Sequence, residues 1–186
     1  MTVATLKINL NAIKRNWKAL NKLSSKKTKT AAVVKANAYG LGIKHVAPSL
    51  WDAGARIYFV SGVEEGIELR SLIPKSAQIF CLNGYEINDD SAFKNFDLIP
   101  IINSKEQLKK FLILNKKEPL GLHVDIGINR LGFKEYEIKK LSDLIKELNI
   151  IIFMGHLSSA DNIKATETKT QLEKFIKVSS FFPKIP

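Results

Sequence analysis

A lysine follows a short run of valines in residues 33–42, which read VVKANAYGLG. Keeping a lysine charged where it leaves a buried strand is costly, and desolvation lowers the pKa of such an amine. A neutral amine can attack a carbonyl carbon or form a Schiff base with it. The alternative is an ordinary surface lysine that extends its ammonium group into solvent. Lys35 is therefore a candidate nucleophile or base.

Two further candidate side chains lie in the second half of the chain. Arg130, one of only four arginines, lies in the glycine-containing segment 125–133 (DIGINRLGF). Its planar guanidinium could hold a phenolate, carboxylate or phosphate, or it could pair with Asp125 to shape the loop. His156 lies in the segment 154–161 (MGHLSSAD), among small polar neighbours. An imidazole there could stack on a flat ring or handle protons, or it could be purely structural.

Hydrophobic periodicity predicts the elements that position these residues. The predicted strands cover residues 31–34, 57–60, 79–82, 98–102, 120–125 and 150–155. The predicted helices cover 11–23, with Asn9 or Asn11 as its N-cap, and then 43–53, 63–72, 104–114, 135–148 and 166–175. Crossovers of this length imply parallel neighbouring strands with right-handed connections, so the fold class is α/β.

The regular alternation favours a (β/α)8 TIM-type barrel, since no glycine-rich dinucleotide fingerprint follows the first strand. A complete barrel typically takes ~250 residues and eight strands. We therefore expect an incomplete barrel of parallel strands, with about six of the eight strands present. Reactive groups of such barrels lie at the carboxyl ends of the strands. The candidate residues lie at or just beyond the ends of three predicted strands.

Composition is that of an ordinary globular protein and excludes several functional classes. The chain has 186 residues, about one domain, with 45% hydrophobic and 25% charged residues. Its single cysteine, Cys81, excludes an internal disulfide. There is no apolar run long enough for a membrane helix and no signal-peptide core, so we expect a soluble, cytoplasmic protein without a membrane partner. The net charge of +11 comes from dispersed lysines and only four arginines, which argues against a nucleic-acid partner.

Taken together, the three motifs resemble the bacterial alanine racemases, which use pyridoxal 5′-phosphate on an N-terminal barrel followed by a β-domain. The segment AVVKANAYGLG is the specific match, and the opening LKINLNAIKRNWKAL is similar as well. The resemblance spans essentially the whole chain. It implies that residues 1–186 form the N-terminal cofactor-binding barrel domain, truncated before the last strands and the β-domain. The implied activity is interconversion of L- and D-alanine for peptidoglycan precursors.

The resemblance also implies a role for each of four residues. Lys35 would bind the cofactor covalently and move a proton on one face of the substrate. Tyr39 would lie near the cofactor phosphate, Arg130 near its phenolic oxygen, and His156 against its ring. No metal site is expected.

Two departures from the family pattern affect these expectations. Where many family members carry a carbamylated lysine that buttresses the arginine, this chain has His123, so another group or an anion could orient Arg130. The family's phosphate-binding loop and its β-domain, whose tyrosine is the base on the opposite face of the substrate, are not in the sequence. We therefore expect weak cofactor binding and slow activity from this chain alone, because a positioned acid or base typically contributes 10²- to 10⁴-fold.

An open arc of six strands leaves two unpaired edges, which favour pairing with another chain. We expect a homo-oligomer or a complex with a complementary fragment. Two alternatives remain open: a non-catalytic or split-protein remnant, and a single-domain pyridoxal-phosphate-binding barrel of the cofactor-homeostasis type. The KANAYG segment disfavours the second of these.

Overall fold

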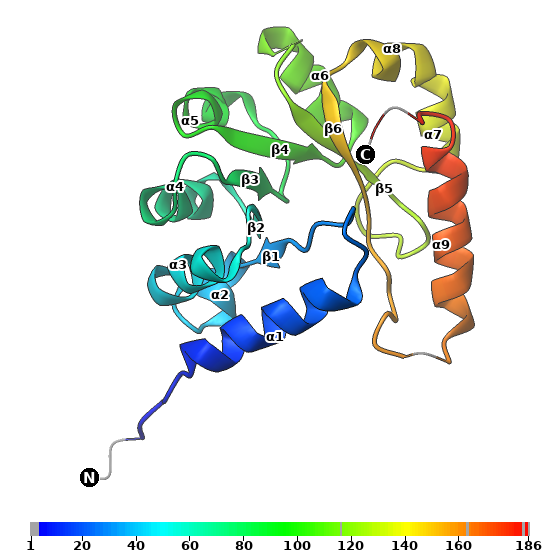
Figure 1. Ribbon diagram of the computed structural model, residues 1–186. Coiled ribbons are helices and arrows are strands. Elements are labelled where there is room, and N and C mark those ends of the chain that lie inside the picture. Colours follow the sequence, from blue (N-terminus) through cyan, green and yellow to red (C-terminus); the bar gives the residue numbers. More distant parts are fainter. Residues whose placement is uncertain (1–3, 116, 163, 184, 186) are drawn as a thin grey trace. The chain divides into compact units, whose positions relative to one another are not determined.

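The computed structural model (Figure 1) describes residues 4–115, 117–162, 164–183 and 185. Its chain divides into two compact units. Unit 1 consists of Met1–Cys81 and Ala92–Leu98, and unit 2 consists of Leu82–Ser91 and Ile99–Pro186. The chain passes from one unit to the other after Cys81, within the helix α5 (Asp90–Asn95) and within the strand β4 (Leu98–Ile102).

Unit 1 contains three parallel strands with helices between them. The strands are β1 (Ala32–Val33), β2 (Ile57–Val60) and β3 (Gln78–Cys81), and β2 pairs with both of the others. The helices are α1 (Leu10–Leu23), α2 (Lys35–Tyr39), α3 (Ile43–Ala53) and α4 (Val63–Leu72). The side chain of Asn9 accepts a hydrogen bond from the backbone N–H of Ala12, which confirms the expected N-cap of α1. Tyr58, Leu69 and Ile79 are fully buried and form the centre of the core of this unit.

Unit 2 repeats the same arrangement. β4 pairs in parallel with β5 (Leu120–Val124), which pairs in parallel with β6 (Ile150–Gly155). Its helical elements are η1 (Ile87–Asp89), α6 (Lys105–Leu114), α7 (Glu135–Lys140), α8 (Ser142–Glu147) and α9 (Thr166–Ser179). Every residue of β5 is buried, as expected for a strand that is covered on both faces.

The six predicted strands are confirmed, but some boundaries differ. The helix expected over residues 135–148 is two helices, α7 and α8, because Leu141 leaves the helical conformation (φ −98°, ψ 7°). The last helix continues beyond residue 175 to Ser179, and α5 was not predicted. The first strand is only two residues long, and Val33 is 47% exposed, so the expected burial of both its faces is wrong. Ala32, which points to the opposite face of β1, is buried, so the strand is covered on one face and not on the other.

None of the described helices is long and apolar enough to cross a membrane.

A substitution at Gly121 tests how tightly the core of unit 2 is packed. A Cβ at this position would meet Cδ1 of Ile101 and lie 2.8 Å from Cγ2 of Ile152, so β5 has no room for a side chain there. We expect Gly121→Ala to lower the free energy of unfolding by about 1–3 kcal/mol, as overpacking a close-packed core does. Urea unfolding of the purified chain measures this.

The matched control is Ile101→Val, which removes the obstructing Cδ1 atom. We expect the double variant to lose less stability than the sum of the two single variants, because the shorter side chain makes room for the new methyl group. Strict additivity of the two single effects would show that Gly121 is not confined by Ile101.

Candidate functional site

Lys35 follows β1 and opens a left-handed helical turn. The backbone N–H of Val34 still donates to the carbonyl of Phe59 in β2, so the strand pairing persists up to the residue before the lysine. Ala36, Asn37, Ala38 and Tyr39 then have φ values between 49° and 55°. Left-handed backbone costs roughly 1–2 kcal/mol per non-glycine residue, and only asparagine among these four tolerates it well. A strained turn of this kind marks a place where the surrounding structure fixes the backbone.

Side chains from unit 1 hold this turn in place. One carboxylate oxygen of Glu65, in α4, accepts from the N–H of Ala36 at 2.7 Å, and the other accepts from the N–H of Ser61 at 2.7 Å. The side chain of Asn37 accepts from the N–H of Ile43 at 2.8 Å and so joins the turn to the start of α3. Gly40, with φ 80°, ends the turn. The direction in which Lys35 leaves β1 is therefore set by α4 and α3.

Lys35 and Tyr39 lie close together at the two ends of this turn. The ammonium nitrogen of Lys35 lies 6.0 Å from the centroid of the Tyr39 ring. Tyr39 is 63% exposed, which leaves its hydroxyl accessible to a ligand. Unit 1 thus presents an amine and a phenol at the carboxyl end of one strand.

In unit 2, His123 lies on β5 and is 3% exposed. Its Nδ1 lies 2.8 Å from Oδ1 of Asn103, the residue after β4. The amide nitrogen of Asn103 donates to the carbonyls of Leu82 and Ile101, at 2.8 and 2.9 Å, and this fixes which end of the amide faces His123. Because Oδ1 can only accept, His123 must carry its proton on Nδ1. Its Nε2 is then an unprotonated acceptor, and this atom is buried without a hydrogen-bond partner in the described part of the chain.

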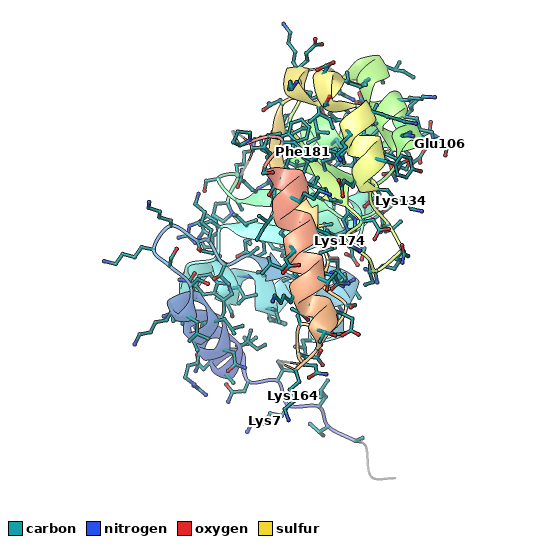
Figure 2. The ribbon with its side chains drawn as sticks, turned by 90° about the vertical axis from the view of Figure 1, so that its right-hand side faces the viewer. Lys7, Glu106, Lys134, Lys164, Lys174 and Phe181 are labelled. Atoms are coloured by element: carbon teal, nitrogen blue, oxygen red, sulfur yellow. The ribbon has the colours of Figure 1, made fainter. Side chains whose placement is uncertain are left out.

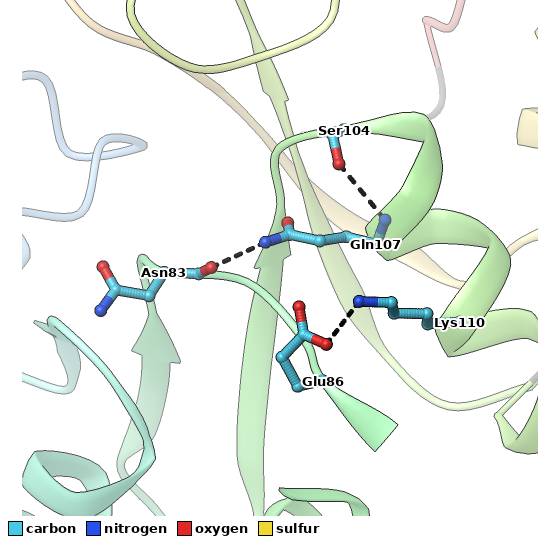
Figure 3. Close-up of polar contacts among 5 residues, drawn as sticks. All are labelled: Asn83, Glu86, Ser104, Gln107 and Lys110. Carbon is cyan, nitrogen blue, oxygen red and sulfur yellow. Dashed lines mark hydrogen bonds and ion pairs between the residues drawn. The ribbon is translucent and has the colours of Figure 1, made fainter. Parts of the chain in front are cut away.

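Gln107, in α6, supports Asn103 with one end of its side chain and reaches Asn83 with the other, and Figure 3 shows the contact with Asn83. Its side-chain oxygen accepts from the N–H of Asn103 at 2.8 Å, and its side-chain nitrogen donates to the carbonyl of Asn83 at 2.8 Å. Lys110, one turn further along α6, pairs with Glu86 at 2.6 Å, close to the same loop (Figure 3). The position of His123 therefore rests on a chain of hydrogen bonds that begins in α6.

The environment of His123 keeps its imidazole neutral. Burial lowers its pKa, and the charges of His156 and Arg130 lower it further, to about 4, against an opposing effect of Asp125. The three residues are thus close enough for their charges to affect His123. At neutral pH the imidazole is an uncharged acceptor.

Arg130 lies in a loop that is tied back onto β5. The carboxylate of Asp125 accepts from the N–H groups of Gly127 and Asn129, both at 3.0 Å. The N–H of Phe133 donates to the carbonyl of His123 at 2.8 Å, which returns the chain to the strand. At Gly132 (φ 106°) a Cβ would lie 2.7 Å from the backbone nitrogen of Asp125, so only glycine allows so close an approach.

The side chain of Arg130 is exposed and makes no hydrogen bond or ion pair with any described residue. The alternative interpretation, an Arg130–Asp125 pair that shapes the loop, is therefore wrong for the described part of the chain: Asp125 uses its carboxylate on the backbone instead. A guanidinium without a carboxylate partner can receive an anion.

His156 follows β6 and is exposed, and α9 fixes the loop behind it. The side-chain oxygen of Gln171 accepts from the N–H of Ser158 at 3.0 Å, and its nitrogen donates to the Ser158 hydroxyl at 3.1 Å. The Thr168 hydroxyl donates to the carbonyl of Ser159 at 3.1 Å. Sequence reasoning missed Gln171, because a polar residue on a mainly polar helix gives no sign that it is buried.

A cavity adjoins the Arg130 loop, and none of the predicted site residues lines it. It has a volume of about 420 Å³ and is lined by Asp125, Gly127, Asn129, Lys134, Glu135, Tyr136, Lys139 and Lys174. Figure 2 labels Lys174 on α9 and Lys134 at the start of α7. Hydrogen bonds from Lys139 and Lys177 lower the pKa of Glu135 to about 2, so its carboxylate stays charged. This negative charge neutralises part of the positive charge of the lysines that line the cavity.

The predicted site residues thus form two groups. Lys35 and Tyr39 are together in unit 1, and Arg130, His156 and His123 are together in unit 2. Each group lies at or just after the carboxyl ends of parallel strands, as expected for a barrel. Within the described residues, no cluster of three His, Cys, Asp or Glu side chains could hold a metal ion.

A family model described as the alanine racemase N-terminal domain matches residues 8–186. The chain belongs to this family. An alanine racemase of Rhizobium meliloti is 41% identical to it over 97% of this chain and 49% of the relative. A biosynthetic alanine racemase of Agrobacterium fabrum is 39% identical over 95% of this chain and 46% of the relative. The chain spans about half the length of the relatives it matches.

Solved structures of the family agree with the fold. A crystal structure of alanine racemase from Bartonella henselae with covalently bound pyridoxal phosphate matches with a TM-score of 0.88 at 31% identity, over 96% of this chain and 54% of that one. The biosynthetic alanine racemase from Pseudomonas aeruginosa matches with a TM-score of 0.81 at 30% identity, over 91% and 49%. The expected fold class, an incomplete α/β barrel of the TIM type, is therefore confirmed.

Glu65→Gln tests whether the carboxylate holds the turn after Lys35. A glutamine has one acceptor oxygen where the two backbone N–H groups need two, so one of them loses its partner. We expect the amide hydrogens of Ala36 and Ser61 to exchange about 10-fold faster, since a lost hydrogen bond to a charged group costs roughly 1.5–3 kcal/mol before local relaxation. Hydrogen exchange measured by NMR detects this.

Glu64→Gln is the control, because Glu64 lies in the same first turn of α4 and is exposed. Equal exchange rates in both variants would mean that Glu65 does not support the turn.

His123 makes stability depend on pH. The unfolded chain takes up a proton near pH 6.5, whereas the folded chain does so only near pH 4, so acid favours unfolding between these values. One pKa unit corresponds to roughly 1.4 kcal/mol, and allowing for screening we expect a loss on the order of 2 kcal/mol between pH 7 and pH 4. Urea unfolding at several pH values measures it.

His123→Gln provides the comparison, because glutamine does not titrate. The stability difference between wild type and this variant should shrink as the pH falls from 7 to 4. A difference that stays constant would show that His123 does not titrate with a lowered pKa.

Proposed function

We propose that this chain is the cofactor-binding part of a pyridoxal-phosphate-dependent alanine racemase, with Lys35 as the residue that carries the cofactor. Membership of the family supports this, as does the Bartonella henselae relative, whose structure contains covalently bound pyridoxal phosphate. The observation that carries the proposal is an amine at a strand end, held by a strained turn inside the segment that matches the family.

The residues present fit the chemistry of this cofactor. Pyridoxal phosphate offers an aldehyde, a phenolic oxygen, a phosphate and a flat ring. The chain offers an amine at Lys35, an exposed guanidinium at Arg130, an exposed imidazole at His156 and an exposed phenol at Tyr39. Charge-assisted hydrogen bonds from arginine to anionic oxygens are among the strongest polar contacts available to a protein. We therefore infer that Arg130 binds the phenolic oxygen, Tyr39 the phosphate and His156 the ring.

The bound cofactor supplies an electron sink for the charge that develops when the Cα proton of an amino acid is removed. The amine of Lys35 is the group of this chain that takes up and returns that proton on one face of the substrate. The left-handed turn serves this step because it restricts the backbone on which the lysine is mounted. Alanine is the substrate in our proposal.

Racemisation also needs a proton donor on the opposite face. We propose that it comes from a second copy of the chain or from a complementary segment, not from the residues described here. In unit 2 the strand β6 pairs on one side with β5, and no other described strand of this unit pairs with it, so a further strand could add to its other edge. The cytoplasmic location and the supply of D-alanine to peptidoglycan precursors belong to the same proposal.

Reductive labelling tests the role of Lys35. Borohydride treatment of the chain mixed with pyridoxal phosphate should fix a phosphopyridoxyl group on Lys35, and peptide mapping by mass spectrometry should find it there. Lys35→Arg keeps the charge but cannot form the covalent link, so the label should fall to the background of surface lysines.

Lys44→Arg is the matched control, because Lys44 is an exposed lysine of α3 and the variant should keep the label on Lys35. Labelling spread evenly over the lysines, and unaffected by Lys35→Arg, would refute the proposal.

A further inference from the structure

His123 has a buried hydrogen-bond acceptor that nothing in the described part of the chain uses. Its Nε2 is buried and has no hydrogen-bond partner among the described residues, and the side chain is 3% exposed. An unsatisfied buried polar atom costs roughly 1–3 kcal/mol, and such atoms are rare in folded proteins. This atom therefore indicates a hydrogen-bond donor that arrives at the site.

The surrounding residues determine what kind of donor it is. Asn103 holds the proton on Nδ1, so Nε2 is the acceptor end of the ring. The pKa of His123 is lowered to about 4 by burial and by the nearby charges of His156 and Arg130, while Asp125 acts in the opposite direction. The ring therefore remains an uncharged acceptor through the neutral range, and a cation that donates a hydrogen bond is its natural partner.

Arg130 is such a cation. Its guanidinium is permanently charged, donates five N–H groups and accepts none. Its loop is anchored beside His123, because the N–H of Gly132 donates to the carbonyl of Asn103 at 3.2 Å and the N–H of Phe133 donates to that of His123 at 2.8 Å. The side chain itself has no described partner and is exposed, so it can change rotamer at little cost.

We propose that His123 is a positioning residue whose neutral Nε2 accepts a hydrogen bond from the guanidinium of Arg130 and thereby aims the remaining N–H groups at an anionic oxygen of the ligand. This link needs a rotamer of Arg130 other than the one in this structure, and it can be tested without a ligand. That the anionic oxygen is the phenolic oxygen of pyridoxal phosphate rests on the proposed function. Asn103 and Gln107 support the same arrangement by fixing the tautomer.

Side-chain NMR on the ¹⁵N-labelled chain tests the link without any cofactor. We expect one histidine with a protonated Nδ1 and an unprotonated Nε2, assigned by its loss in His123→Gln, that stays neutral between pH 8 and pH 5. Arg130→Gln removes the charged guanidinium and shortens the side chain, and it should shift the Nε2 resonance of His123. Because Arg130 is exposed, this variant should fold even if substitutions of the buried histidine do not.

Two control variants separate a hydrogen bond from a general change of charge. Lys174→Gln removes another cation near the same loop and should leave the Nε2 resonance in place. Asn103→Asp should stabilise the charged imidazolium, protonate Nε2 and abolish the response to Arg130→Gln. A protonated Nε2 in the wild type, or a resonance that responds to His156→Gln and not to Arg130→Gln, would overturn the proposal.

Binding of pyridoxal phosphate gives a second readout. We expect His123→Leu to weaken binding about 10-fold, because an arginine that is not held in place must be ordered by the ligand. His45→Gln, at an exposed histidine of α3, should not change it. If the NMR response is present but pyridoxal phosphate does not label Lys35, the proposed function fails and the positioning role stands. If Lys35 is labelled but the NMR response is absent, only the positioning role fails.

Discussion

The Glu65 carboxylate accepts hydrogen bonds from two backbone N–H groups. One belongs to Ala36, in the turn that follows β1, and the other belongs to Ser61, the residue after β2. Four consecutive non-glycine residues of this turn have left-handed backbone, which raises the free energy of the folded state. The two hydrogen bonds to Glu65 offset part of this increase. Each bond is charge-assisted, which makes it stronger than a bond between neutral groups. The orientation of Lys35 relative to β1 and β2 follows from this interaction.

In unit 2, hydrogen bonds between side chains, and not a strained backbone, hold His123 in place. Gln107, Asn103 and His123 form a series of hydrogen bonds in which every amide group has a defined role. Such a series leaves the histidine only one tautomer, and burial keeps it uncharged. The result is a single acceptor atom, Nε2, at a fixed place beside the loop of Arg130.

The two units differ in what a substitution would disturb. In unit 1 a change at Glu65 alters the backbone on which the lysine is mounted. In unit 2 a change at Asn103 alters the charge and the proton position of a neighbouring ring, with little change in the backbone of β5. The family model covers residues of both units.

The sequence by itself determined the strands, most of the helices and the identity of the fold family. Strands such as 57–60 and helices such as 43–53 and 63–72 were predicted to the residue, because burial imposes a periodicity that can be read along the chain. The motif residues Lys35, Tyr39, Arg130 and His156 could also be named from the sequence, and their roles stay predictions.

Only the tertiary structure decided the left-handed turn, the division of the helix at Leu141, the tautomer of His123 and the burial of Gln171. Two alanines in the turn have no preference for left-handed backbone, and the reason for their conformation lies in Glu65, almost thirty residues away. The proton on His123 is likewise set by two carbonyls that orient Asn103. Periodicity reports which face of an element is buried, but a hydrogen bond between distant residues depends on the packing that brings them together.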